Sequence, residues 1–447
     1  MERKERKEKK GLISVPVATA VGLGAIIGAG IFVLSGTAIA LAGADALIAF
    51  VIVGVVSIIL ALEMGELSSI MPDVKGASYS YTFKAFGSRL GFITGIFMYL
   101  ALAISISVVA LGFGAYLSSI LGISAVTYSI PFAIALIAVL AVVNLLGVAK
   151  AARADAVLVV IKILILLIFI GFAILVAFSG VGTGAVSHFT FDISAKGIGG
   201  IFAASIAIFF AYSGFQSIAT FSGKIKGGGI GAAKAILAAV LISLMLYVLV
   251  VFALLLLLPP TSYTISADPL TFALTSSGAP SWLLLLVGIG ALIATTSAAL
   301  ATILSASRSI YQMSEDGLLP KILMSYNKKK GTAENGIILS AAIAVIMLFA
   351  GNIYIIVSIV AFSLMFDYLL LGFDIIHFRR LNSKPDFKIP LYPYLPVLGI
   401  LILISFFVVL PVDVLVLGIG IFIFLVILYH FLSKSKKKIG ANVRLFG

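Results

Sequence analysis

The sequence predicts an all-α polytopic membrane protein with twelve transmembrane helices, and three observations support this fold class. First, 62% of the 447 residues are hydrophobic and only 11% are charged, whereas soluble domains carry about 25% charged residues. Second, the apolar residues form continuous segments rather than alternating patterns, which indicates a helix bundle and not a β-barrel. Third, the positive charges lie in every second connection between these segments.

The apolar segments follow one another along the whole chain. A run of roughly 20 apolar residues is long enough to cross a bilayer as a helix. The expected spans are 14–42, 46–70, 90–118, 124–147, 154–179, 198–221, 233–258, 282–312, 337–351, 353–377, 395–410 and 412–432. This divides the chain into a basic N-terminus (1–13), spans 1–5 (14–179), spans 6–10 (198–377), spans 11–12 (395–432) and a basic tail (433–447).

The charge distribution predicts the orientation. Of the 30 lysine and arginine residues, all but Lys162 and Lys196 fall on one side of the predicted topology. The positive-inside rule then places both termini in the cytoplasm of a multi-pass cell-membrane protein. The net charge of +13 follows from this topology and from attraction to membrane lipids with anionic headgroups, so no nucleic-acid partner is expected. The absence of cysteine from the sequence excludes disulfides, thiolate metal sites and a cysteine nucleophile.

Glycines cluster near the middle of the first span, in the stretch Gly24-Ala25-Ile26-Ile27-Gly28-Ala29-Gly30. Residues without a side chain let the backbone leave helical geometry and let a ligand approach the main chain. A break there would expose N–H groups at the start of a half-helix, where they attract an anion such as a carboxylate. The alternative is a close-packing helix face built from Gly24 and Gly28.

The sixth span contains a second candidate break, in Phe209-Phe210-Ala211-Tyr212-Ser213-Gly214-Phe215. Alone, this stretch is also compatible with an aromatic patch in the core. The two candidate breaks fall at matching positions, in span 1 of the first five and span 6 of the next five. Paired interruptions of this kind indicate a transporter built of two inverted five-helix repeats.

Lys162 lies inside the fifth span, surrounded by valine, leucine and isoleucine. A lysine facing lipid there costs at least about 2.5–3.5 kcal/mol, so its side chain is expected to point into the bundle. A buried lysine readily gives up its proton, which makes a functional role the default hypothesis. The alternative is that the side chain reaches back to the cytoplasmic surface.

Polar residues in three other spans have both structural and functional interpretations. Thr296 and Ser297 in span 8 either line a polar site or bond to carbonyls of their own helix. Glu63 and Glu66 share a helix face and are expected to pair with Arg89 or Lys84, with gating as the alternative. In span 10, we expect Asp374 to form an ion pair with the basic residues that follow it, whereas Asp367 has no evident role.

The motifs resemble those of the amino acid–polyamine–organocation (APC) transporters. The resemblance covers spans 1 to 8, and spans 9 to 12 match in layout only. It rests on Gly24 to Phe32, on Glu66-Leu67-Ser68 with Pro72, Gly76, Tyr79 and Tyr81, on Phe210 to Phe215, and on Ser307-Arg308 with Tyr311 and Asp316 to Pro320. It implies a LeuT-like fold of five plus five inverted helices with two extra spans.

The resemblance also implies a site for each substrate group. Backbone at Gly28, Ala29 and Gly30 would hold a substrate carboxylate, and backbone at Ala211, Tyr212 and Ser213 would hold the amino group. Phe210 matches an aromatic lid over the substrate, and Gly214 belongs to the same substrate-binding stretch. Lys162 matches a lysine of proton-coupled members, whose ammonium takes the place of a sodium ion between Gly24 and the hydroxyls of Thr296 and Ser297.

Two departures from the family pattern bear on the substrate and the gate. Gln216 stands where some exchangers have glutamate, and Ser222-Gly223-Lys224 lies where many members carry paired glutamates. The expected pocket has no acidic side chain for a cationic substrate, so neutral amino acids are favoured.

The expected function is therefore proton-coupled symport of neutral amino acids, with no cofactor, no metal and no catalysis. Amino acid exchange without net proton flux and a non-transporting amino acid sensor on the same fold are the alternatives. A channel is disfavoured because the sequence lacks charge rings and carbonyl filter motifs. An intramembrane enzyme is disfavoured because there is no cysteine and only three histidines, His188, His377 and His430.

Overall fold

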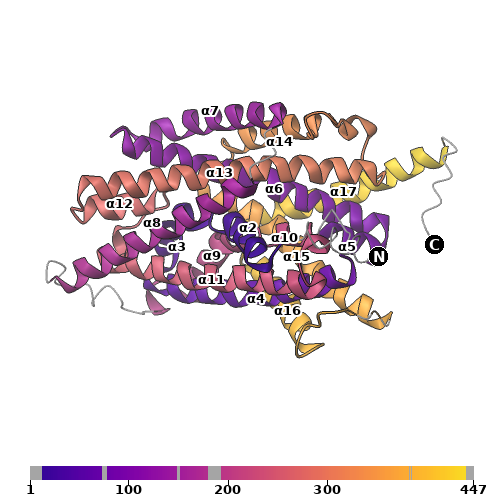
Figure 1. Ribbon diagram of the computed structural model, residues 1–447, viewed down its shortest axis with the longest axis horizontal. Coiled ribbons are helices and arrows are strands. Elements are labelled where there is room, and N and C mark those ends of the chain that lie inside the picture. Colours follow the sequence, from indigo (N-terminus) through magenta and orange to yellow (C-terminus); the bar gives the residue numbers. More distant parts are fainter. Residues whose placement is uncertain are drawn as a thin grey trace, which may run out of the picture.

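The computed structural model is a bundle of helices that run roughly along its longest axis (Figure 1). It describes residues 13–72, 78–147, 152–179, 193–381, 383 and 385–438, and these ranges contain isolated β-bridges but no strand. Within them, nine helical segments are long and apolar enough to cross a membrane, and three apolar helices are shorter. The all-helical membrane class is confirmed, and the count of twelve spans stays a prediction.

The helices match the predicted spans closely. Their bounds are α2 Val15–Ile26, α3 Ala29–Ala42, α4 Ala46–Ile70, α5 Ser78–Phe86, α6 Ser88–Ile120, α7 Ala125–Leu146, α8 Ala152–Phe178, α9 Ile193–Phe209, α10 Gln216–Ala219, α11 Gly228–Leu257, α12 Pro269–Ser276, α13 Ser281–Glu315, α14 Glu334–Met347, α15 Ile353–Arg380, α16 Tyr394–Val409 and α17 Val412–Lys438. Short 3-10 turns are η1 Gly43–Asp45, η3 Phe210–Tyr212, η4 Ser222–Lys224, η5 Pro260–Ser262 and η6 Lys321–Met324.

Both predicted helix breaks are confirmed. In the first span, α2 ends at Ile26 and α3 begins at Ala29, because Ile27 (ψ 55°) and Gly28 (ψ −120°) leave helical geometry. In the sixth span, α9 gives way to η3 and then to a turn through Ser213 and Gly214 before α10. Gly214 has a φ of +113°, a conformation that favours glycine.

Two helices were not among the predicted spans. The α5 helix precedes α6 and is separated from it by Gly87, whose φ is +82°. The α12 helix begins with Pro269, which fits the first helical position because its missing N–H is not needed there. It packs directly on α3, since a Cβ built on Gly36 would lie 2.5 Å from the Cβ of Pro269.

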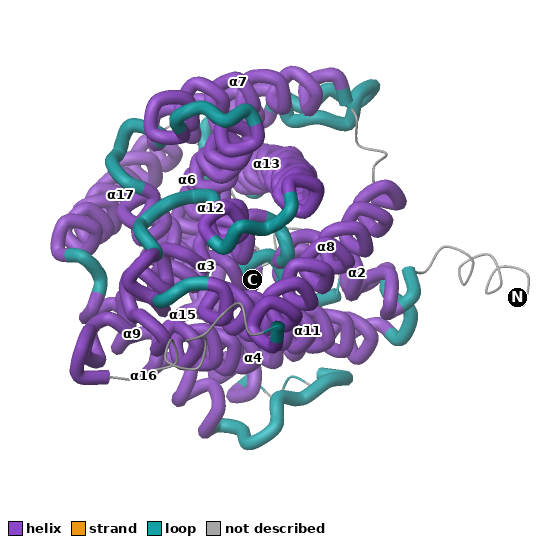
Figure 2. Tube along the Cα trace, turned by 90° about the vertical axis from the view of Figure 1, so that its left-hand side faces the viewer, coloured by secondary structure: helices purple, strands orange, loops and turns teal. Residues whose placement is uncertain are grey.

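The α3 helix, the second half of the broken first span, lies in the middle of the bundle. Figure 2, which looks along the long axis, shows α3 and α12 surrounded by α6, α13, α8, α11, α4 and α15. The outer helices leave large apolar side chains exposed, among them Val126 of α7 and Val408 of α16. Exposed apolar surface of this kind suits lipid, where burying it against protein brings no hydrophobic gain.

A two-residue backbone bridge ties the start of α2 to the segment that follows α10. The Ile13 N–H donates to the Lys224 carbonyl, and the Lys226 N–H donates to the Ile13 carbonyl, both at 2.8 Å. Main-chain hydrogen bonds therefore join the segment before α2 to the segment after α10.

Candidate functional site

The two helix breaks lie directly against each other. A Cβ built on Gly30 would lie 2.5 Å from the Cα of Ala211, and one built on Gly214 would lie 2.9 Å from the carbonyl carbon of Ala25. Real Cβ atoms do not approach other atoms so closely, so these contacts depend on glycine at both positions. The structure thus brings together the two stretches that the sequence singled out.

The start of α3 presents main-chain donors at this junction. Gly28 is its N-cap and offers no side-chain cap, so the first N–H groups of α3 lack the partner that a serine or aspartate would supply. The α13 helix also borders the junction of the two breaks, because a Cβ on Gly28 would lie 2.8 Å from the Cβ of Ala298. Donors at the positive end of a 14-residue helix can bind a carboxylate.

Tyr247 of α11 connects the two breaks. Its hydroxyl lies 2.6 Å from the Ile26 carbonyl at the end of α2 and 3.0 Å from the Ala211 carbonyl in η3. The ring packs against Tyr212 at 5.0 Å between centroids. Sequence reasoning missed Tyr247, although a lone tyrosine in an apolar span must find a partner for its hydroxyl.

The side-chain hydroxyls of the second break are used inside the protein. Tyr212 donates to the Phe50 carbonyl of α4 at 2.9 Å, and Ser213 donates to the Phe210 carbonyl at 2.7 Å. Tyr212 is buried and Phe210 is half-buried. The contribution of this stretch to a ligand would therefore come from its main chain, as the resemblance implies.

Gln216 holds the turn between η3 and α10. Its Oε1 accepts from the Gly214 N–H and from the Tyr368 hydroxyl of α15, both at 2.8 Å. The ring of Tyr368 also stacks on Phe215 at 5.6 Å. Gln216 thus links the second break to α15 without introducing a charge.

Lys162 is completely buried in α8, which confirms that its side chain stays inside the bundle. The α8 helix packs against α2, which carries the buried Gly24, and against α13. Three residues after Lys162, Ile165 lies so close to α13 that a Cβ on Gly290 would be 2.7 Å from its Cδ1. The helices that carry the expected proton-coupling residues therefore meet here.

Some hydroxyl groups of α13 donate to carbonyls of their own helix, which is the structural interpretation of these residues. Ser297 donates to the Ala294 carbonyl of its own helix at 3.2 Å, and Thr295 does the same to Ala291 at 2.7 Å. Thr296 and Ser297 are half-buried. A hydroxyl that donates to its own helix keeps its acceptor capacity, so both positions stay predictions for the coupling site.

Two expected ion pairs were wrong. Glu66 pairs with Arg379 of α15 and not with Arg89 or Lys84, through contacts of 2.5 and 2.9 Å to Nε and Nη2. Asp374 accepts from the Thr82 hydroxyl of α5 at 2.8 Å and forms no ion pair among the described side chains. The reason is the same in both cases, since α15 packs against α4, which carries Glu66, and against α5, which carries Thr82, although α15 is far from both in the sequence.

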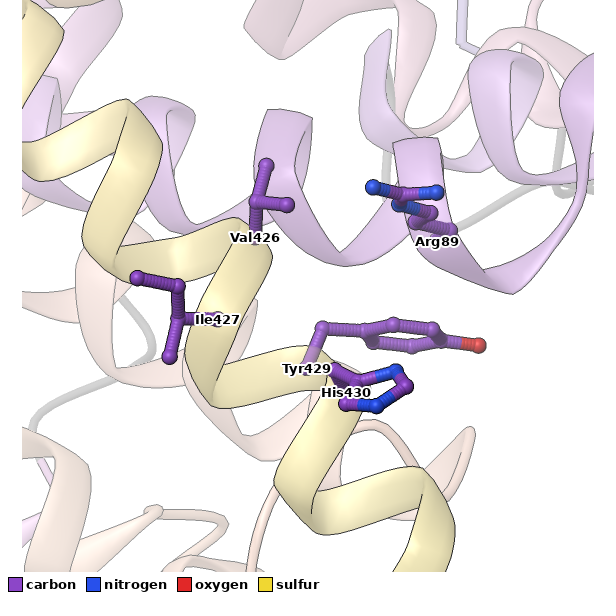
Figure 3. Close-up of a pocket in the computed structure, with 5 residues that line it drawn as sticks. All are labelled: Arg89, Val426, Ile427, Tyr429 and His430. Atoms are coloured by element: carbon purple, nitrogen blue, oxygen red, sulfur yellow. The ribbon is translucent and has the colours of Figure 1, made fainter.

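Two open grooves lie away from the helix breaks. One, of about 320 Å³, lies between α6 and α17 and is lined by Arg89, Val426, Ile427, Tyr429 and His430. Figure 3 shows the Arg89 guanidinium on the same side as the rings of Tyr429 and His430. The other, of about 340 Å³, is lined by Phe86, Phe373, Ile376, His377 and Arg380.

Comparisons with known proteins find similarity to membrane transporters. A family model described as amino acid permease matches residues 17–440. The methylthioribose transporter of Bacillus subtilis is 27% identical over 413 residues, which are 88% of this chain and 87% of that protein. The branched-chain amino acid permease BcaP is 26% identical in Bacillus subtilis (88% and 86% covered) and 29% in Lactococcus lactis (85% of each).

Solved structures support the fold. A manganese transporter of Eremococcus coleocola, crystallised as a point mutant, superposes with a TM-score of 0.55 at 16% identity, covering 93% of each chain. At this identity the likeness concerns the fold alone.

Proposed function

Because the chain belongs to the amino acid permease family, whose members are transporters and not enzymes, we propose that it is a secondary active transporter of neutral amino acids coupled to protons. The observation that carries the proposal is the contact between the two helix breaks, Gly30 on Ala211 and Gly214 on Ala25. Two half-helices meeting in the middle of a bundle are the typical binding site of transporters with inverted repeats.

The substrate would be held by main-chain groups of both breaks. The N–H groups at Gly28, Ala29 and Gly30 would bind its carboxylate, and backbone oxygens at Ala211, Tyr212 and Ser213 would bind its amino group. Phe210, next to the turn at Gly214, would cover the substrate. The residues named here carry no charge, which favours a neutral side chain, as does the similarity to branched-chain amino acid permeases.

Lys162 would couple transport to protons. In its protonated form the ammonium would hold α2 near Gly24 and α13 near Thr296 and Ser297. Loss of the proton would weaken this hold and shift the equilibrium between outward-open and inward-open states. The complete burial of Lys162 at a helix that packs on α2 and α13 supports this role.

The transport cycle would proceed by alternating access. Gly28, Gly30, Ala211 and Tyr212 are all buried in this conformation, so a substrate can reach them only when neighbouring helices move. We also propose the twelve-span topology in the cell membrane with both termini in the cytoplasm, contacts with anionic lipids, and two inverted repeats.

The test is uptake into proteoliposomes with an inward proton gradient and no sodium. Labelled leucine, isoleucine, valine and alanine would be compared, with unlabelled methylthioribose as competitor because one relative carries that name. We expect gradient-driven uptake of at least one amino acid, and its loss in Lys162→Ala. Lys226→Ala, which removes an exposed lysine, is the matched control and should keep full uptake.

Other outcomes point to the alternatives. Exchange between preloaded vesicles without gradient-driven uptake would make the protein an antiporter and leave Lys162 a structural role. Substrate-dependent thermal stabilisation without any flux would favour a sensor. Stabilisation of Lys162→Ala by substrate would show that the variant is folded and that its defect lies in coupling.

A further inference from the structure

Three carboxyl side chains are buried together between α4, α5 and α15, away from the helix breaks. Glu63 of α4 and Asp367 of α15 are 1% exposed, and Asp374 of α15 is 0% exposed. Asp367 and Asp374 are two helical turns apart on one face of α15. Asp374 is near enough to act electrostatically on Glu63 of α4 and on Asp367.

The hydrogen bonds of these carboxyls are few. Ser78 and Thr82 of α5 donate to Asp367 Oδ2 at 2.7 Å and to Asp374 Oδ2 at 2.8 Å. Among the described residues, the other oxygen of each aspartate and both oxygens of Glu63 have no hydrogen-bond partner. Glu63 instead faces the main chain of α16, where a Cβ on Gly399 would lie 3.2 Å from its Oε1.

A further buried group lies near the same cluster. Tyr81 of α5 is 0% exposed, and within the described part of the chain its hydroxyl has no hydrogen-bond partner. Burial and then the Asp374 carboxyl raise the pKa of Tyr81, so the two groups lie near each other. The further group near this excess of acceptors is therefore a neutral hydroxyl and not a cation.

The surrounding elements supply no compensating charge in the described ranges. On α15, Arg379 is engaged by Glu66, while His377 is half-buried against Phe86. On α5, Lys84 is exposed and Tyr79 donates to Asp316. The α16 helix has no charged residue between Tyr394 and Val409, and α11 and α6 contribute only the exposed Lys234 and Arg89. On α17, which also packs on α15, the titratable residues between 412 and 431 are Asp413, Tyr429 and His430, of which Asp413 and His430 are exposed.

Three buried carboxylates without a cation cannot all be ionised, because burial and mutual repulsion both disfavour the charged form. A metal ion is one way to neutralise them, but no group of three potential ligands among the described residues is placed to hold one. Protonation is the remaining way to neutralise these carboxylates. A carboxylate oxygen that accepts no hydrogen bond becomes a hydrogen-bond donor when it is protonated.

We infer that Glu63, Asp374 and Asp367 form a proton-binding site distinct from Lys162, in which Glu63 and Asp374 carry at least one proton in this conformation. The proton leaves for water only when α4 and α15 separate, and the carboxylate that remains then favours the separated, hydrated state. One turn further along the same two helices, Glu66 and Arg379 form their ion pair. The site thus makes opening at this end of the bundle sensitive to pH.

The test is infrared spectroscopy of the purified protein in lipid at neutral pH. A protonated carboxylic acid has a C=O stretching band that a carboxylate lacks. We expect this band in the wild type, and its reduction in Glu63→Gln and in Asp374→Asn. Asp413→Asn, at an exposed carboxyl of α17, is the matched control and should leave the band unchanged.

A second measurement follows stability against pH. Since the folded state holds a proton that the unfolded state releases, the thermal midpoint should fall as the pH rises above neutrality. Glu63→Gln mimics the protonated acid in shape and should flatten this fall. Absence of the band, a band unchanged in both variants, or an alkaline fall unchanged in Glu63→Gln would overturn the inference.

The result is independent of the proposed function. Lys162→Ala should keep the carboxylic-acid band whether or not it abolishes uptake. Conversely, a protein that transports normally but shows no band retains its proposed function and loses only this second proton site.

Discussion

Arg379 of α15 binds both carboxylate oxygens of Glu66 of α4, although 313 residues separate them in the sequence. The Ile389 N–H adds a third donor to Glu66 Oε2 at 2.6 Å, and the Arg379 guanidinium lies 4.9 Å from the centre of the Tyr392 ring. Glu66 is completely buried, whereas the Arg379 side chain is 19% exposed. The buried Glu66 carboxylate therefore depends on its partner for charge neutralisation more than the partly exposed Arg379 does.

Arg379→Gln should destabilise the protein more than Glu66→Gln. Removing Arg379 leaves a buried carboxylate without its cation, which costs about 3–5 kcal/mol for a fully buried pair, whereas Arg379 can regain water. Thermal unfolding in detergent would measure the difference. Arg380→Gln, at the exposed neighbour, serves as control and should change the midpoint little. Equal losses from Arg379→Gln and Arg380→Gln would contradict the structural role of the pair.

Gly30→Ala should abolish substrate binding, because its Cβ would lie 2.5 Å from the Ala211 backbone and would force the two breaks apart. Gly171→Ala in α8 is the control, since nothing lies within 4 Å of its Cβ. There alanine should stabilise the helix by up to about 1 kcal/mol. The thermal midpoint without substrate measures the effect of Gly171→Ala, and its rise on adding substrate measures binding by both variants. Wild-type binding by Gly30→Ala would refute the tight contact.

Tyr247→Phe should impair transport more than it impairs folding. The change removes a hydroxyl whose single proton is shared between carbonyls of both breaks, at a cost of about 1 kcal/mol in stability. Tyr263→Phe is matched to it, because Tyr263 is also buried and donates to one carbonyl, that of Leu254, at 2.6 Å. Uptake and thermal midpoint would be measured for each. Similar uptake by both variants would show that Tyr247 does not organise the site.

Asp268, the residue before α12, predicts a pH dependence outside the spans. Burial raises the pKa of Asp268 to about 6, against the opposing effect of its hydrogen bonds, while the unfolded value is about 3.9. The contribution of Asp268 to the stability of the folded protein is thus fully present below the unfolded pKa. About 2–3 kcal/mol of the free energy of unfolding is lost as the pH rises to 6.

Asp268→Asn should remove this loss. The variant should match the wild type near pH 4 and exceed it in thermal stability at pH 7, with Asp413→Asn as the exposed control. If the difference between the variant and the wild type does not grow between pH 4 and pH 6, the raised pKa of Asp268 is wrong.

The sequence predicts what local composition controls. The break at Gly28 follows from backbone freedom, and the burial of Lys162 follows from its depth in an apolar segment, so both were foreseeable. The partner of Glu66 was not, because charge and spacing within one helix say nothing about a residue on α15. The same limit applies to Tyr247, whose two acceptors belong to different broken helices, and to the α12 helix, whose register on α3 depends on Gly36.

The backbone bridge between Ile13 and the Lys224–Lys226 segment decides where motion can be observed. Probes placed on α2 and on α10 would sit on one tied unit, and the distance between them should stay constant through the cycle. A probe on α2 paired with one on α15 would instead span separate elements. Since the natural sequence contains no cysteine, engineered thiols at such positions would be the sole attachment points for fluorophores or spin labels, and wild-type background labelling would not arise.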